Sequence, residues 1–172
     1  MRQTKTCSEE TAMGELTVSF DTAETVVDAA PMHGITAGTC VLTLEGELPV
    51  QFLAPGDRVI TRSGAKVLKA IEVVVVRDAA MVRISASALG HDRPEGDLYV
   101  APSQPILVRD WRAKALYGRA VTMVEAQRLA DGDYIRREMV AEVRLFTLRF
   151  EREEVVYASG LELACAPVSI PA

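Results

Sequence analysis

The chain has 172 residues and a formal net charge of −5, and 49% of its residues are hydrophobic although only 5% are aromatic. This length suits one domain with an aliphatic core, and the ordinary content of proline, glycine and charge excludes global disorder. The mild acidity argues against a nucleic-acid partner, which requires a basic patch. No run approaches the roughly 20 apolar residues of a membrane-spanning helix, so no membrane partner is expected.

The cysteines Cys7, Cys40 and Cys165 are widely spaced along the chain. An odd number without a C-x-x-C pair predicts neither a disulfide framework nor a zinc site, and we expect no metal and no cofactor. Near the N-terminus, Glu9 and Glu10 stand where a signal peptide requires an apolar run. A cytoplasmic location is the default expectation, and secretion by a route without a signal peptide stays open.

Short apolar or alternating segments recur along the chain, separated by turn residues. Residues 15–21 alternate with a period of two, which predicts one strand within an otherwise flexible N-terminal extension. The same signals predict further strands at residues 39–44, 48–50, 58–61, 65–76, 81–84, 98–100, 106–108, 134–136, 143–150 and 155–158. Segment 65–76 ends in four consecutive valines, which favours a strand covered on both faces or one that passes between two sheets.

Two segments carry helical signals. Residues 110–116 begin with Asp110, which is a favourable N-cap. Residues 122–129 are the stronger candidate, because Thr122 and Glu125 have the spacing of a capping box and an Asp-Gly-Asp sequence follows. Many strands and few helices predict an all-β domain, although spacing alone does not distinguish a sandwich from a barrel.

One stretch, residues 34–64, has a specific pattern. It reads G-T-x-V-x-T, then a glycine turn, then P-V-x-x-L-x-P-G-D-x-V-x-T-x-x-G, in which Pro55 and Gly56 favour a tight turn. This pattern resembles the opening of Hint domains, the self-cleaving module shared by hedgehog proteins and inteins, and is most similar to the bacterial Hint-like group. Shorter similarities follow in order, among them Ala88-Leu89-Gly90 and residues 154–161.

The resemblance implies a Hint-type horseshoe of short and curved antiparallel strands with one or two short helices. It divides the chain into an N-terminal extension (1–33), a Hint-like β domain (34–167) and a tail (168–172). Long strands bend through both halves of this architecture, which suits the apolar run 65–76. A weaker alternative is that only the first hairpin is shared and that the rest is an unrelated β fold.

The resemblance also implies a chemistry. Self-cleavage in Hint domains begins with a Cys or Ser at the first residue, which attacks the preceding carbonyl in an N-to-S or N-to-O acyl shift. A later T-x-x-H or S-P-x-H motif supplies a histidine that protonates the leaving nitrogen. Here the nucleophile position is Gly34, which has no side chain. In the second motif Ala101 replaces the hydroxyl residue, and Gln104, which cannot transfer a proton, replaces the histidine.

A late turn, where relatives carry an acidic residue and a histidine, reads Glu151-Arg152-Glu153, and no His-Asn pair ends the sequence. We therefore expect no catalytic residue, and interpret the chain as a catalytically degenerate Hint-like domain. It would act as a binding or scaffold module for an unknown protein or peptide, for example one laid against a strand edge. The alternative is residual self-cleavage near the His33–Gly34 bond, with Cys40 as the fallback nucleophile, although a free cysteine is usually a small buried hydrophobe.

Overall fold

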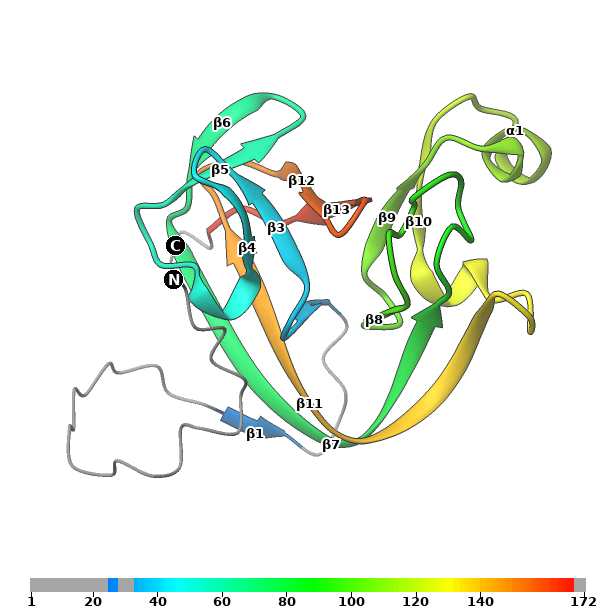
Figure 1. The fold of residues 1–172 in the computed structure, drawn as a ribbon, viewed down its shortest axis with the longest axis horizontal. Coiled ribbons are helices and arrows are strands. Elements are labelled where there is room, and N and C mark those ends of the chain that lie inside the picture. Colours follow the sequence, from blue (N-terminus) through cyan, green and yellow to red (C-terminus); the bar gives the residue numbers. More distant parts are fainter. Residues whose placement is uncertain (1–24, 28–32, 169–172) are drawn as a thin grey trace, which may run out of the picture.

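The computed structural model describes residues 25–27 and 33–168, so the strand predicted at 15–21 lies outside the described residues. Two long strands, β7 (Ala70–Ile84) and β11 (Ile135–Arg149), curve together along the base of a U, and shorter strands stand on its two arms (Figure 1). The predicted all-β fold with curved antiparallel strands is confirmed. Within the described residues, no helix has the length and apolar character needed to cross a bilayer.

The strands form two sheets. The first has the order β1-β7-β11-β2-β8, and its short strands are β1 (Thr25–Val27), β2 (Ile35–Thr36) and β8 (Leu98–Val100). The second has the order β10-β9-β13-β12-β3-β5-β6, with β4 paired to β3. Its strands are β3 (Cys40–Thr43), β4 (Gly46–Pro49), β5 (Arg58–Thr61), β6 (Gly64–Val67), β9 (Pro105–Val108), β10 (Thr122–Glu125), β12 (Glu154–Ala158) and β13 (Leu161–Cys165).

β7 and β11 pair antiparallel along nearly their whole lengths. The ladder breaks opposite Asp78, whose φ of +49° is uncommon for a residue other than glycine. The prediction of separate strands at 81–84, 134–136 and 143–150 was wrong, because these segments belong to the two long strands. The four charged residues within 136–142 do not interrupt β11, since cross-strand pairing satisfies the strand backbone whatever its side chains are.

The helical predictions had opposite outcomes. The helix at 110–116 is confirmed as α1 (Trp111–Tyr117), where the Asp110 carboxylate accepts a hydrogen bond from the Arg112 amide at 2.9 Å. The prediction of a helix at 122–129 was wrong, because the first half of this segment is strand β10 and the second half is the 3-10 helix η2 (Ala126–Leu129). Pairing with β9 prevails over the capping-box signal there. A further 3-10 helix, η1 (Val50–Phe52), follows β4.

The main hydrophobic core lies between the two sheets. It includes Val41, Ile106, Leu148 and Leu163, each at most 1% exposed. A smaller cluster packs on the long strands and contains Val76, Ala79, Met81, Ala101 and Leu145. The two clusters hold β7 and β11 from both sides, as expected for the apolar run of valines in β7.

A buried carboxylate joins three distant parts of the chain. Glu162 lies in β13, a strand that was not predicted, and is only 2% exposed. It accepts contacts from Arg62 Nη1 at 2.6 Å, Arg93 Nη2 at 2.9 Å and Arg109 Nη2 at 2.7 Å. These arginines follow β5, precede β8 and follow β9, so the one carboxylate connects elements of both arms.

We expect Glu162→Gln to lower the free energy of unfolding by about 2–3 kcal/mol, because it leaves three guanidinium groups without their shared anion. The arginines are partly exposed, which reduces the loss below that of a fully buried pair. Urea unfolding followed by circular dichroism measures this difference. Glu142→Gln is the control, because its ion pair with Arg77 is largely exposed and its removal should cost less than about 1 kcal/mol. Equal losses in the two variants would contradict the role given to Glu162.

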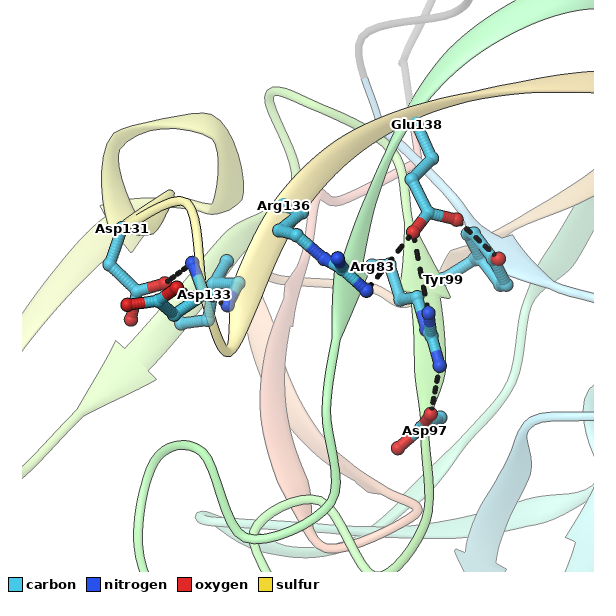
Figure 2. Close-up of polar contacts among 8 residues, drawn as sticks. Arg83, Asp97, Tyr99, Asp131, Asp133, Arg136 and Glu138 are labelled. Atoms are coloured by element: carbon cyan, nitrogen blue, oxygen red, sulfur yellow. Dashed lines mark hydrogen bonds and ion pairs between the residues drawn. The ribbon is translucent and has the colours of Figure 1, made fainter.

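A second polar network lies on the first sheet, where Arg83, Tyr99 and Glu138 come from adjacent strands (Figure 2). The Tyr99 hydroxyl donates to Glu138 at 2.7 Å, and Arg83 contacts both Glu138 and Asp97. The hydrogen bond from Tyr99, followed by those from Arg83, lowers the pKa of Glu138. The backbone amide of Ala86 and the Arg83 guanidinium lower the pKa of Asp97.

These lowered pKa values predict an acid-sensitive contribution to stability. Ordinary values are 4.5 for Glu and 3.8 for Asp, and both folded-state values lie below them. As the pH falls through this window, the unfolded chain takes up protons that the folded chain does not, so the free energy of unfolding decreases. We expect Glu138→Gln to flatten this decrease in urea titrations between pH 2 and pH 6, and Asp97→Asn to act in the same direction. An unchanged slope in both variants would show that the network does not couple folding to protonation.

Candidate functional site

A cavity of about 330 Å³ opens where the start of the domain meets its final strand. His33 and Gly34 form one side, β7 and β11 contribute a second, and the end of β13 contributes a third. Gln104 and Glu153 also line it. The His33–Gly34 bond therefore lies in the wall of a cavity whose other sides come from segments far apart in the sequence.

The side chain of Gln104 joins three of these segments. It is 2% exposed, and its Oε1 accepts a hydrogen bond from the Gly34 amide at 3.0 Å. Its Nε2 donates to the carbonyl of Ala164 at 2.9 Å and to that of Pro105 at 3.1 Å. Both polar atoms of this amide are thereby satisfied inside the protein. Gln104 connects the first residue of the domain to the last strand, and it holds no proton that it can transfer.

The backbone at Gly34 suits glycine. Its φ is +145°, a conformation that L side chains rarely adopt, and a Cβ atom here would lie 3.0 Å from the Cβ of Leu145. That distance is shorter than ordinary van der Waals contact, so Leu145 would have to move. A cysteine or serine at position 34 therefore conflicts with this backbone as well as being absent from the sequence.

His33 is oriented by the loop that contains Gln104. Its Nδ1 lies 3.1 Å from the carbonyl oxygen of Ser103. A carbonyl oxygen only accepts, so Nδ1 carries the proton in the neutral ring and Nε2 has a free lone pair. His33 is exposed, whereas the adjoining Gly34 is buried.

Of the expected site positions, the structure brings Gly34, Gln104 and Glu153 to the cavity. Ala101 is fully buried in the smaller core cluster and does not line the cavity. Glu151 lines a separate hollow. Within the described residues, no group of three His, Cys, Asp or Glu side chains could hold a metal ion.

The model of the Hint domain family matches residues 33–164. The chain belongs to the Hint domain family. The identification from the residue 34–64 pattern is thereby confirmed, and the matched segment covers the long curved strands and all of the cavity lining except Cys165 and Ala166. No curated protein matches the sequence significantly.

Solved structures of inteins share this fold. A splice-inactive variant of the AceL NrdHF class 3 split intein has a TM-score of 0.52 at 12% identity, over 80% of this chain and 99% of that one. The bacterial intein-like domain from Clostridium thermocellum has a TM-score of 0.51 at 18% identity, over 79% and 99%. The MchDnaB-1 intein has a TM-score of 0.50 at 13% identity, over 76% and 98%. At these identities the likeness concerns the fold.

Two thiols of this Hint domain lie in different places. Cys40, the fallback nucleophile, lines a third hollow away from the His33–Gly34 bond, and partial burial followed by Glu47 and Glu95 raises its pKa. Cys165 lines the cavity itself. Burial raises the pKa of Cys165 to about 12, although Arg149 acts in the opposite direction. A thiol that keeps its proton is a poor nucleophile, so neither cysteine is activated for attack.

The cavity also contains a charged pair that the sequence did not indicate. Arg149 Nη2 lies 3.0 Å from Glu72 Oε2, and both residues line the cavity. The Nε atom of Arg149 is buried and has no hydrogen-bond partner among the described residues. The pairing of β11 with β7 brings Arg149 next to this site, and pairing of distant strands has no local sequence signal.

We expect Gly34→Ala to destabilise the Hint domain by about 1–3 kcal/mol, because it adds both backbone strain and a contact with Leu145. Gly38→Ala is the matched control, since Gly38 has a φ of +89° but no atom within 4 Å of its Cβ position. The control should show the cost of the backbone conformation alone. Thermal and urea unfolding of both variants provide the comparison, and a smaller loss for Gly34→Ala than for Gly38→Ala would contradict the steric argument.

Proposed function

We propose that this Hint domain does not cleave its own backbone and that it binds a polypeptide partner in the cavity beside Gly34. Two observations carry the first half of the proposal: the backbone at position 34 has a φ that L side chains rarely adopt, and the amide of Gln104 is fully used in structural hydrogen bonds. An acyl shift needs an attacking atom and a proton donor at the same bond. Both positions instead hold residues that support the fold.

The cavity supports the second half of the proposal, that the domain binds a polypeptide partner. Its volume of about 330 Å³ lies within the range of ligand sites, and apolar side chains such as Val74, Phe146 and Leu148 contribute to its lining. One wall of the site is backbone of the chain itself, at His33 and Gly34, and the other walls come from β7, β11 and β13.

Residual cleavage is the second candidate, because Cys165 lines the same cavity as the His33–Gly34 bond. Its thiolate sulfur would attack the carbonyl carbon of His33, the bond to the Gly34 nitrogen would break, and that nitrogen would leave with a proton. At neutral pH, a thiol with a pKa of about 12 is ionised to only on the order of one part in 100,000. The thiolate is therefore too scarce for this route to be favoured.

We expect intact-mass spectrometry of the purified chain to show no cleavage after prolonged incubation with dithiothreitol or hydroxylamine. These reagents would release a fragment ending at His33 from a thioester or ester, because they attack an activated acyl group faster than an amide. A fragment that disappears in Cys165→Ala would establish the second candidate, and one that disappears in Cys40→Ala would implicate the other thiol.

Binding is tested separately by NMR with the neutral peptide N-acetyl-Ala-Leu-Ala-amide. We expect it to shift the amide signals of Gly34 and Ala164. Ala166→Phe should abolish these shifts, because Ala166 is exposed and lines the cavity. Ala65→Phe is the matched control at an exposed position of a separate hollow. The absence of shifts, or shifts that Ala166→Phe leaves intact, would overturn the binding proposal.

A further inference from the structure

Three guanidinium groups surround one carboxylate on the outer face of the β12–β13 hairpin. Along β13, the side chains of Leu161, Leu163 and Cys165 belong to the main hydrophobic core. Glu162 lies between them in the sequence, and it points away from that core because successive side chains of a strand point to opposite faces. Glu162 is nevertheless only 2% exposed. The guanidinium groups in contact with its oxygens therefore cover it and form the protein surface at this place.

The three arginines come from distant parts of the sequence but end next to one another. Arg62 Nη1 lies 2.6 Å from Glu162 Oε1, whereas Arg93 Nη2 and Arg109 Nη2 lie 2.9 and 2.7 Å from Oε2. These contacts use one nitrogen of each guanidinium group, and the other nitrogens have no hydrogen-bond partner among the described residues. The side chains of Arg62 and Arg109 are 40% and 44% exposed. Their remaining N–H groups are therefore available to a molecule from solvent.

The charges of this arginine cluster do not balance. Three guanidinium groups and one carboxylate leave a surplus of about two positive charges, in a chain whose formal net charge is −5. The acidic residues next to the arginines in the sequence have other contacts, since Asp110 pairs with Arg112 at 2.5 Å and Asp92 lies 3.3 Å from His91. Glu154, the other acidic residue of the hairpin, lies on its opposite face. Because like charges repel, a further anion would stabilise the cluster.

We propose that Arg62, Arg93 and Arg109 bind a phosphate dianion, either free or as a monoester such as that of a phosphorylated serine. A phosphate monoester carries a charge of about −1.5 to −2 at neutral pH, which matches the surplus of the cluster. Planar guanidinium groups bind phosphate oxygens through two parallel N–H bonds, and clusters of arginines recognise phosphorylated segments in this way. None of these arginines lines the cavity beside Gly34, so this site is separate from that of the proposed function.

The test is a calorimetric titration of the full chain with sodium phosphate and with N-acetyl-Ala-phosphoserine-Ala-amide. The peptide N-acetyl-Ala-Glu-Ala-amide is the comparison with a single negative charge. We expect both phosphate compounds to bind more tightly than the glutamate peptide, and added sodium chloride to weaken their binding. Arg62→Gln and Arg109→Gln should each weaken phosphate binding about three- to ten-fold, as for the loss of a charge-assisted hydrogen bond near the surface.

Arg77→Gln is the matched control. It removes the same charge from an exposed arginine, whose partner Glu142 lies on β11 and outside the cluster. The control should leave phosphate affinity unchanged, and a loss equal to that in Arg62→Gln would overturn the proposal, because net charge alone would then explain the binding. Circular dichroism shows whether each variant folds. Arg62 and Arg109 follow different strands, so either variant decides the outcome if the other does not fold.

The ligands separate the possible carriers of the phosphate group. Equal affinities for inorganic phosphate and the phosphopeptide would assign the site to the phosphate group alone, whereas tighter binding of the phosphopeptide would assign it to a phosphorylated protein partner. Equal affinities for the phosphoserine and glutamate peptides would overturn the preference for a dianion. If neither phosphate compound binds, the arginines serve only to neutralise Glu162 and the proposal fails.

Discussion

The antiparallel ladder between β7 and β11 is the constraint on which the rest of this fold depends. Its register sets Ala70 opposite Arg149 at one end and Ile84 opposite Ile135 at the other. The short strands of both arms pair with it or pack on it, and none of those that the structure describes is longer than five residues. Such short strands are not stable alone, so their positions follow from the curvature of the long pair. The cavity lies against this ladder, which contributes Val74, Phe146 and Leu148 to its lining.

The amide of Gln104 has a structural role, because all of its hydrogen bonds are made within the protein. Where the resemblance to Hint domains expects a proton donor, this chain has a side chain that donates and accepts within the protein. A histidine there would present its ring to the peptide bond, whereas the glutamine amide pairs with the Gly34 backbone and with β13. Gly34 beside it has a φ of +145°, which L side chains rarely adopt, and a Cβ atom there would lie 3.0 Å from the Cβ of Leu145.

Much of the fold was accessible from the sequence, and less of the site. The turn pattern around Pro55 and Gly56 indicated the family, and the motif positions led to Gly34 and Gln104 at the cavity. Local signals failed at 122–129, where pairing with β9 outweighs helix capping. Local sequence signals gave no indication of Arg149, Glu72 or Cys165. These residues line the cavity through strand pairings between distant segments. The environment of Glu162 was equally hidden, since its three arginines are remote in the sequence.

The domain begins and ends at one place, because His33 and Ala166 line the same cavity. A polypeptide that enters the domain at the first of these residues and leaves it at the second returns to nearly its point of departure. Domains whose two ends lie close together tolerate circular permutation and insertion into other chains, and the ends of this domain meet that geometric condition.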